Sequence, residues 1–306
     1  MSKIQVTKLH TLSGHKDSVY TIEGVADSQF VSGAGDGMIV LWDLEQPEDG
    51  QLVAKLDNSI YAIHQESQHG FLLVGHNYDG LHVLDWKNKK ELGSLNFTEA
   101  AIFSINSHNQ LAYVGTGDGE MIVINIPELK IIKRIKLSTE RVRSIAVNPV
   151  NKELAIGYSD AVIRILDLDT LEVKQELSAH AKSVFKLQYS QNYNTLISTS
   201  RDAHFMVWDA ECKYDQMEDV VAHMYSINDI VYNPDGNLFA TCSMDKSIKI
   251  WDAKTYKLLK VIDKARHAGH GTSVNKLWWN NKMNQLVSAS DDRSISIWKI
   301  NPNSQQ

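Results

Sequence analysis

The sequence contains little cysteine and no long apolar run. Its 306 residues include two cysteines, Cys212 in a polar stretch and Cys242 in an apolar one, and we expect no disulfide between them. Such sparse use of cysteine is typical of a reducing compartment. No apolar run approaches the roughly 18–20 residues that a membrane helix needs, and residues 1–12 lack the apolar core of a signal peptide. We therefore expect a cytoplasmic protein without membrane partners.

The chain also lacks an excess of basic residues. It carries 31 Lys and Arg against 37 Asp and Glu, a formal net charge of −6 at pH 7. A balance of this sign gives no general attraction for nucleic acid or for an anionic membrane. Nucleic acid is therefore not expected as a partner. The hydrophobic content of 43% is enough for a large buried core.

A repeated phrase of a dozen or so residues dominates the sequence. Residues 241–252, TCSMDKSIKIWD, begin with small residues, turn at residues 244–246 and end in an apolar run closed by Asp. This pattern predicts a β-hairpin. Related phrases occupy residues 30–43, 196–209 and 286–299, and in all four a Trp lies six residues after an Asp of the turn. Recurrence at about 40–45 residues is typical of the blades of a β-propeller.

Three weaker units complete the series. In blades two, three and four we assign the Trp position to Asp85, Ile124 and Leu166. The seven positions then follow one another at intervals of 39 to 47 residues, and the longest interval places its extra residues between Trp251 and His270. Units of one near-constant length predict one closed ring, a single domain over residues 1–306. The expected blades are residues 14–56, 57–97, 98–137, 138–177, 178–221, 222–262 and 263–300.

Two dipeptides within the repeat carry a family resemblance. Gly-His precedes a first strand at 14–15 and 269–270, and Trp-Asp follows a third strand at 42–43, 208–209 and 251–252. On these motifs the sequence resembles the WD40-repeat family over about residues 3–300. The resemblance implies an all-β fold, a single seven-bladed β-propeller of four-stranded antiparallel blades. It also implies that a strand at residues 4–12 pairs into the last blade, which closes the ring without a free sheet edge.

Four blades place a His, a Ser or Thr, an Asp and a Trp at matching positions. A Ser-His-Asp set invites a hydrolase interpretation, but this set occurs four times and lacks a nucleophile-elbow glycine pattern. The resemblance implies instead a buried chain of hydrogen bonds that ties each blade together. We expect no catalytic residue among them. The four sets are His15, Ser32, Asp36 and Trp42; His180, Ser198, Asp202 and Trp208; His223, Thr241, Asp245 and Trp251; and His270, Ser288, Asp292 and Trp298.

Two further positions of each repeat are candidates for contact with a binding partner. In WD40 proteins, the residue after the first-strand anchor and the residue before the turn Asp commonly border the central channel and contact bound peptides. Here these positions supply aromatic residues, Met and Arg, the types that interface centres enrich. They favour a peptide with acidic and apolar groups, although the aromatic side chains could instead only plug the channel or pack between blades. The candidate partner face is Tyr20, Tyr61, Tyr78, Phe103, Arg143, Phe185, Arg201, Asn228, Met244, Asn275 and Asp291.

These observations predict a non-catalytic, monomeric scaffold that binds other proteins or peptides and assembles a multiprotein complex. One alternative is a propeller enzyme, which would need an acid pair or a His cluster facing the channel. A second is a nucleic-acid-associated subunit, which the acidic balance disfavours. No cofactor is expected. No metal site is expected either, because His267 and His270 are close enough in sequence to share an ion but His270 already belongs to a blade set.

Overall fold

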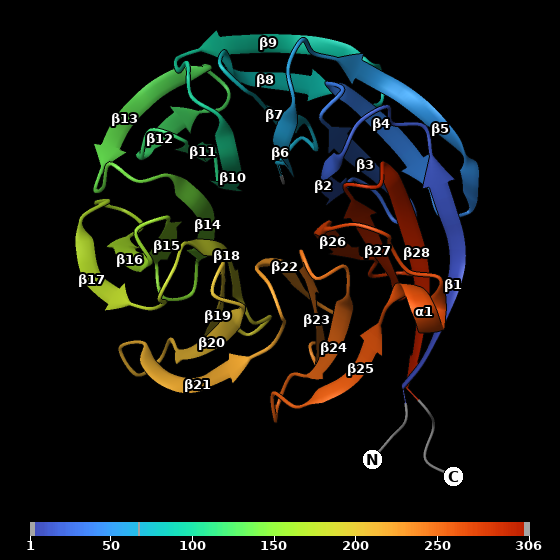
Figure 1. The fold of residues 1–306 in the computed structure, drawn as a ribbon. Helices are drawn as coiled ribbons and strands as arrows, with labels where there is room; N and C mark the ends of the chain where they lie inside the picture. Colours follow the sequence, from blue (N-terminus) through green and yellow to red (C-terminus); the bar gives the residue numbers. More distant parts are fainter. Residues whose placement is uncertain (1–3, 67, 303–306) are drawn as a thin grey trace.

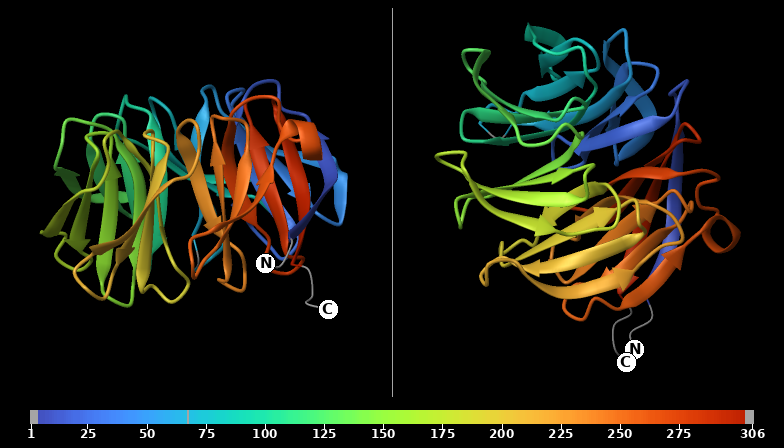
Figure 2. Two further views of the ribbon diagram at one scale, coloured as in Figure 1. Left: turned by 60° about the horizontal axis from the view of Figure 1, so that its bottom comes forward. Right: turned by 60° about the vertical axis from the view of Figure 1, so that its left-hand side comes forward.

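The computed structural model describes residues 4–66 and 68–302, so the two ends of the expected domain and residue 67 lie outside the described residues. Seven four-stranded antiparallel sheets stand around a central axis (Figure 1). The strands of each blade run between the two faces of the ring (Figure 2). The predicted all-β, seven-bladed propeller is confirmed.

In each of blades one to six, four consecutive strands form the sheet, the first beside the channel and the fourth at the rim (Figure 1). Blade one contains β2 (Val19–Gly24), β3 (Gln29–Ala34), β4 (Met38–Asp43) and β5 (Gln46–Lys55). Blade two contains β6 (Ile60–Gln65), β7 (Leu72–His76), β8 (Gly80–Asp85) and β9 (Lys90–Asn96). Blade three contains β10 (Ile102–His108), β11 (Leu111–Thr116), β12 (Glu120–Asn125) and β13 (Lys130–Lys136).

The second half of the ring follows the same order. Blade four contains β14 (Val142–Asn148), β15 (Glu153–Tyr158), β16 (Val162–Asp167) and β17 (Val173–Ser178). Blade five contains β18 (Val184–Tyr189), β19 (Thr195–Ser200), β20 (His204–Asp209) and β21 (Asp215–Val221). Blade six contains β22 (Ile227–Tyr232), β23 (Leu238–Ser243), β24 (Ile248–Asp252) and β25 (Leu258–Ile262). Two strands run past the blade bounds expected from the sequence: β17 ends one residue beyond residue 177, and β28 (Ser294–Pro302) ends two residues beyond residue 300.

Blade seven is completed by the start of the chain. It contains β26 (Val274–Trp279), β27 (Gln285–Ser290) and β28 (Ser294–Pro302), and its outermost strand is β1 (Ile4–Ser13). β1 pairs antiparallel with β28 along its whole length, from Ile4 opposite Pro302 to Ser13 opposite Ser294 (Figure 1). Because first and last strands share one sheet, blade seven has no unpaired edge at β28.

The longest connection between blades holds the extra residues that the spacing predicts. It contains the short helix α1 (Lys264–His267), whose N-cap Asp263 accepts a hydrogen bond from the Arg266 amide at 2.8 Å. Lys8 Nζ of β1 donates to the Ala268 carbonyl just after this helix, at 2.8 Å. None of the helices in the described residues has the length and apolar character to span a membrane.

The core lies between neighbouring blades rather than at the centre of the ring. Val31 and Ile39 of blade one, for example, pack in one cluster with Ile60 and Leu72 of blade two. The second strands are almost entirely buried, and a glycine recurs where the next blade approaches most closely. At Gly75 a Cβ atom would lie 2.7 Å from Ile102 Cγ2, so a side chain there would push two blades apart.

The register corrects two sequence-based assignments in blade two. β7 and β8 pair Leu72 with Leu84, as Phe30 pairs with Trp42 in blade one, so Leu84 rather than Asp85 holds the Trp position. Gly75 pairs with Leu81 as Gly33 pairs with Ile39, which places Tyr78 rather than Asp79 at the position of Asp36. The turn Asp of blade two has therefore shifted by one residue along the chain.

Candidate functional site

The four predicted His-Ser/Thr-Asp-Trp sets each form a continuous chain of hydrogen bonds. In blade one, His15 Nδ1 lies 3.2 Å from Asp36 Oδ2, His15 Nε2 lies 2.7 Å from Ser32 Oγ, and Trp42 Nε1 donates to Ser32 Oγ at 2.8 Å. The equivalent links in blades five, six and seven measure 2.8–3.1 Å.

The burial of these sets shows whether their role is catalytic or structural. All four hydroxyl-bearing residues, Ser32, Ser198, Thr241 and Ser288, have no exposed surface. A nucleophile must be reached by its substrate, so none of these hydroxyls can attack one. The carboxylate instead ties two parts of the blade together, because Asp36 accepts from the Lys16 amide at 2.7 Å as well as from His15.

Protonation states in the sets follow from burial and hydrogen bonding. Burial lowers the pKa of His15 and of His223 despite the adjacent carboxylates, which keeps both imidazoles neutral at pH 7. Burial alone would raise the pKa of Asp245, but bonds from His223, Ser247 and the Met224 amide lower it well below its usual range. In blades one and six the set is therefore an ionised carboxylate beside a neutral, hydrogen-bonded imidazole.

Among the described residues, blades two, three and four lack a bond from the turn Asp to the loop before the first strand, and we expect these blades to open more readily. In the four complete blades, the turn Asp accepts a backbone amide of the loop before the first strand, at 2.7–3.1 Å. A charge-assisted bond of this kind contributes about 1.5–3 kcal/mol. Amide hydrogen exchange is therefore expected to be at least about tenfold faster in loops 57–59, 99–101 and 139–141 than in loops 16–18, 181–183, 224–226 and 271–273. Equal protection all round the ring would contradict this role.

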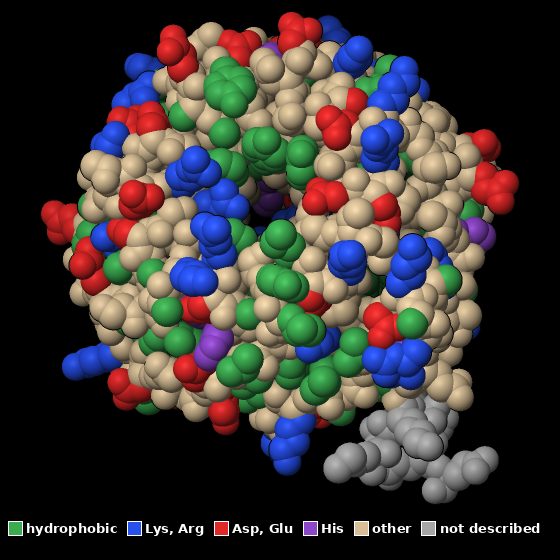
Figure 3. Space-filling model, viewed as in Figure 1, with side chains coloured by type: hydrophobic (Ala, Val, Ile, Leu, Met, Phe, Trp, Pro, Cys, Tyr) green, Lys and Arg blue, Asp and Glu red, His purple; other side chains and the backbone are tan. Residues whose placement is uncertain are grey.

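A cavity of 590 Å³ opens at the centre of the ring, between the N-terminal ends of the innermost strands. We call it the channel mouth. Figure 3 looks onto this opening: hydrophobic side chains gather above and below it, Lys and Arg to its left, and acidic groups to its right. Ten of the eleven candidate residues line it: Tyr20, Tyr61, Phe103, Arg143, Phe185, Arg201, Asn228, Met244, Asn275 and Asp291.

Tyr78 does not line the channel mouth. The register shift in blade two moves it one residue along the turn, and its amide donates to the Ala100 carbonyl of the next blade at 3.2 Å. Its side chain is 61% exposed. The residue at the predicted position is Asn77, which is buried and accepts from the Ile102 amide through Oδ1 at 3.0 Å. Tyr78 is therefore removed from the set that surrounds the opening.

An aromatic row forms one wall of the channel mouth. The rings of Tyr20 and Tyr61 meet edge to face with centroids 4.7 Å apart, and Tyr61 stacks on Phe103 at 5.7 Å. The Arg143 guanidinium lies over Phe103 at 4.4 Å and over Phe185 at 4.6 Å, which joins the two rings. The aromatic side chains thus pack on one another, as the alternative interpretation expected. They also remain partly exposed and border the cavity.

Arg143 brings a largely buried positive charge to this wall. Burial, with a smaller contribution from Arg141, lowers the pKa of Arg143 to about 10, so the guanidinium is still charged at pH 7. Its Nε is buried without a hydrogen-bond partner among the described residues. Stacking between two aromatic faces compensates part of this cost through cation–π attraction. The two aromatic rings therefore hold the guanidinium of Arg143 in place, and its Nε–H has no acceptor among the described residues.

The opposite wall is held together by asparagines. Asn228 Nδ2 donates to the Val274 carbonyl of the next blade at 2.8 Å, and Asn275 Nδ2 donates to the Val19 carbonyl at 3.0 Å. Asn275 also donates to Asp291 Oδ1 at 2.7 Å. These bonds connect blades six, seven and one. Asn228 and Asn275 therefore have a structural task, whereas the exposed side chain of Met244 beside them does not.

A charged group within the channel mouth was missed by the sequence analysis. Lys276 Nζ lies 3.5 Å and Lys186 Nζ 3.9 Å from Asp229 Oδ1, so two ammonium groups face one carboxylate. The charge of Lys276, together with burial, lowers the pKa of Lys186 to about 8. Burial opposes ionisation of Lys276 too, but the Asp229 and Glu23 carboxylates outweigh it and raise its pKa.

A β-bulge explains why these residues face the channel. The first strand of every blade shifts register just after its anchor residue, for instance between Val184 and Lys186. The residue inside the bulge and the one after it then both border the cavity, as Phe185 and Lys186 do. Simple alternation would have placed Lys186 on the same face as Val184. The repeated bulge doubles the number of side chains that each blade offers to the channel.

The opposite end of the channel has a second hollow. This cavity of 460 Å³ is lined by Asn106, Gln188 and Tyr232 among others, at the C-terminal ends of the innermost strands. Lys186 borders both cavities. Nearby, Glu23 Oε1 lies 3.3 Å from His64 Nδ1 and also accepts from the Gln65 amide at 3.1 Å. This acid and this His link blade one to blade two through hydrogen bonds.

Comparisons with known proteins agree with this architecture. The family model "WD domain, G-beta repeat" matches residues 6–43, 216–252 and 262–299, and the model "Anaphase-promoting complex subunit 4 WD40 domain" matches residues 106–192. The chain belongs to the WD40-repeat family. The crystal structure of the WD40 β-propeller domain of Doa1 superposes with a TM-score of 0.85 at 19% identity, covering 96% of this chain and 97% of that one.

Relatives identified by sequence are distant. THO complex subunit 3 of Arabidopsis thaliana is 23% identical over 194 residues, which cover 62% of this chain and 61% of the relative. Topless-related protein 2 of Oryza sativa subsp. japonica is 27% identical over 106 residues, 34% of this chain and 9% of the relative. The chain thus spans less than two thirds of either relative.

Proposed function

We propose that this propeller is a non-catalytic scaffold that binds another protein at the channel mouth and helps to assemble a multiprotein complex. The observation that carries the proposal is the composition of the mouth, an aromatic row that Arg143 joins, with Arg201 lining the same cavity. Two of the similar proteins and family models bear the names of complex subunits, THO complex subunit 3 and anaphase-promoting complex subunit 4. A closed ring also presents its loops with little ordering cost on binding.

The chemistry of the mouth favours a peptide with both acidic and apolar groups. Among the described residues, no carboxylate lies within ion-pair distance of Arg143 or Arg201; the paired arginines are Arg134, Arg164 and Arg266. An acidic side chain of a partner would supply the missing charge. Apolar groups would pack on the aromatic row and on the exposed Met224, Tyr225 and Met244 in the loops of blade six on the same face of the ring.

Replacing Tyr61, Phe185 and Arg201 together with alanine is expected to weaken binding at least about 100-fold, because central aromatic residues and Arg carry most of the energy of an interface. The probe is a peptide selected against the wild-type chain from a random displayed library, with its dissociation constant measured by titration calorimetry. The matched control replaces Leu52, Ile132 and Val173, exposed apolar residues of the outer strands, with alanine. An unchanged dissociation constant in the mouth variant, with its fold intact, would refute the proposal.

Binding of an acidic peptide is expected to weaken roughly three- to tenfold between pH 7 and pH 9, since Lys186, with a pKa of about 8, loses its charge over this range. The charged groups that face Lys186 are Lys276, Asp229 and Glu23. Lys276 keeps its charge because its pKa is raised. The measurement is the dissociation constant of the selected peptide against pH. Lys186→Met should flatten the profile, and an identical slope in that variant would exclude Lys186 as the cause.

The other expectations from the sequence stay predictions. A cytoplasmic location is tested by cell fractionation, and a monomeric state by light scattering of the purified chain. We propose no enzymatic activity. The Glu23–His64 pair is the kind of channel-facing acid and His that would favour one, but both residues already bond to neighbouring strands, Glu23 to the Gln65 amide and His64 Nε2 to Ser107 Oγ at 2.9 Å.

A further inference from the structure

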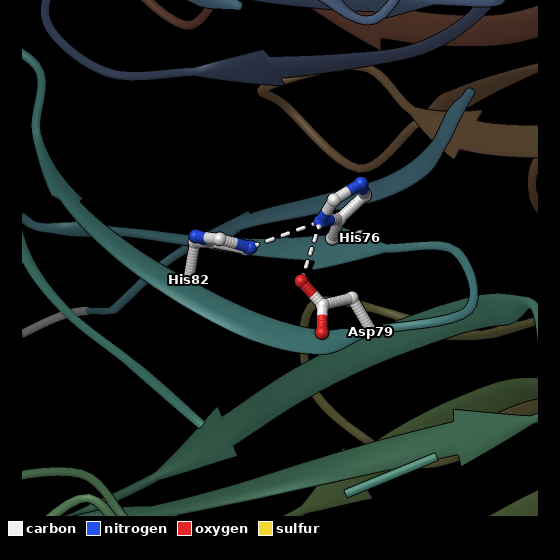
Figure 4. A group of neighbouring side chains, drawn as sticks. All are labelled: His76, Asp79 and His82. Atoms are coloured by element: carbon white, nitrogen blue, oxygen red, sulfur yellow. Dashed lines mark hydrogen bonds and ion pairs between the residues drawn. The ribbon is translucent and has the colours of Figure 1, made fainter. Parts of the chain in front are cut away.

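Blade two replaces the missing hydrogen-bonded set with a cluster of two histidines and an aspartate. His76 ends β7, Asp79 lies in the turn, and His82 lies on β8, so the hairpin brings the three side chains together (Figure 4). His76 Nδ1 lies 3.1 Å from His82 Nε2 and 3.3 Å from Asp79 Oδ2. The three atoms face one another across a space of less than 4.8 Å.

These separations fit the ligands of one metal ion. Zinc binds imidazole nitrogen and carboxylate oxygen at about 2.0–2.2 Å, usually with tetrahedral geometry, which places neighbouring ligand atoms about 3.3–3.5 Å apart. The observed separations of 3.1 and 3.3 Å need only a small outward movement of the side chains. Two nitrogens and one oxygen are donors that suit divalent zinc, cobalt, nickel or copper better than calcium or magnesium.

The surroundings orient the ligands as they do in metal proteins. His82 Nδ1 lies 2.8 Å from Glu91 Oε1, so the imidazole can donate its proton to that carboxylate and keep the lone pair of Nε2 directed at the cluster. Asn96 Nδ2 donates to Asp79 Oδ1 and leaves Oδ2 facing His76. A carboxylate–imidazole pair of this kind fixes the tautomer that a metal requires.

The turn geometry holds the aspartate in the cluster. Tyr78 and Gly80, on either side of Asp79, both have positive φ angles, 71° and 130°. A Cβ atom at residue 80 would lie 2.1 Å from the Leu95 carbonyl oxygen, so only glycine fits there. This backbone differs from the other hairpin turns and directs Asp79 toward His76 instead of toward the preceding loop.

The cluster combines a buried base with an accessible side. His76 is 6% exposed, whereas the side chain of Asp79 is 43% exposed, so an ion and a water molecule can enter beside the carboxylate. One side of the cluster is therefore enclosed by the blade and the other is open to solvent.

We propose that His76, Asp79 and His82 form a site for a first-row divalent metal ion, with zinc as its most suitable occupant. His76 Nδ1, His82 Nε2 and Asp79 Oδ2 are the ligands, and water takes the fourth position. On binding, the proton of His76 moves from Nδ1 to Nε2 of the same imidazole, so that the Nδ1 lone pair takes the ion and the net charge of His76 is unchanged. The site is separate from the channel mouth, because none of its residues lines that cavity.

The test is a titration of the chelator-treated protein with Zn²⁺, followed by calorimetry, and with Co²⁺, followed by visible absorption. We expect a single equivalent to bind, a rise in melting temperature with zinc, and a Co²⁺ spectrum of a four-coordinate nitrogen and oxygen site. His82→Ala should weaken the affinity by more than about 100-fold, and Glu91→Gln, which alters only the supporting carboxylate, by about 10–100-fold.

The matched control is His204→Ala. His204 and Asp219 form a surface imidazole–carboxylate pair at 2.6 Å in blade five, without a second His. This variant should bind zinc like the wild type. Glu91→Gln keeps the test informative if His82→Ala fails to fold, since Glu91 is exposed. Zinc affinity that is unchanged in both His82→Ala and Glu91→Gln, or binding of no stoichiometric equivalent by the wild type, would overturn the proposal.

Discussion

Removing residues 1–13 is expected to abolish cooperative unfolding of the chain, and Leu12→Ala alone should lower the free energy of unfolding by about 2–5 kcal/mol. β1 forms the outermost strand of blade seven, and its own residues Ile4 and Leu12 are buried against the blade. Without it, the hydrogen-bonding edge of β28 is open and the ring is not closed. Urea denaturation followed by circular dichroism measures both effects.

Thr11→Ala is the matched control for this experiment. Thr11 neighbours Leu12 on the same strand, but its side chain points to solvent. Its replacement should change stability by less than about 0.5 kcal/mol. If the shortened chain unfolded cooperatively with the stability of the full one, closure of the ring by β1 would not be what holds blade seven in place.

Trp298→Ala is expected to lower the free energy of unfolding by about 3–5 kcal/mol, the usual cost of emptying a buried aromatic site. Trp298 has no exposed surface and packs with Ile4, Leu286 and Trp279. Its Nε1 donates to Ser288 Oγ at 2.9 Å. The loss therefore combines a cavity with a broken hydrogen bond, and urea denaturation again gives its size.

Trp298→Phe separates the two contributions. Phenylalanine keeps most of the volume but cannot donate, while Ser288 Oγ remains 2.9 Å from His270 Nε2. We expect a cost of only about 1–2 kcal/mol for this variant. A phenylalanine variant as unstable as the alanine variant would show that the hydrogen bond from the indole, and not the packing of the aromatic side chain, dominates at this site.

The seven-bladed fold was predictable because the blades repeat one kind of hairpin with a recognisable sequence pattern. The Trp that lies six residues after a turn Asp marks the hairpin of four blades, and the hydrogen-bonded chains of those blades contain the residues that the pattern named. Blade two does not follow this six-residue spacing. Its Asp79 stands one residue late relative to the strands, so counting from that Asp misplaced both Tyr78 and the Trp position.

Of the side chains that line the channel mouth, the sequence predicted the residue directly after each first-strand anchor but not the residue that follows it. Tyr61, Phe103 and Phe185 follow directly from the residue after each anchor. Lys186 and Lys276 do not, because a bulge turns them toward the channel where alternation would place them in the core. The lysines themselves were a usable signal: a charged residue at an expected core position indicates either a partner or a change of register.

The histidine cluster of blade two was missed for a related reason. Sequence proximity singled out His267 and His270, but a hairpin turn brings His76 and His82 into contact although five residues lie between them. In this hairpin His76 pairs with Gly80 and His82 with Val74, so the two histidines are diagonal cross-strand neighbours, which long side chains can bridge. In a propeller sequence, histidines on the two strands of one hairpin are therefore candidates for a shared metal ion, as are histidines close together in one loop.

The most direct test of the proposed function is to locate a bound peptide on the ring. Hydrogen exchange of the chain would be compared with and without a peptide selected against it. We expect protection at the channel mouth, in residues 184–186, 201–203 and 226–229, and none around the opposite cavity lined by Asn106, Gln188 and Tyr232. Protection at that opposite cavity or along the outer strands, with the mouth unchanged, would contradict the assignment of the mouth as the binding site.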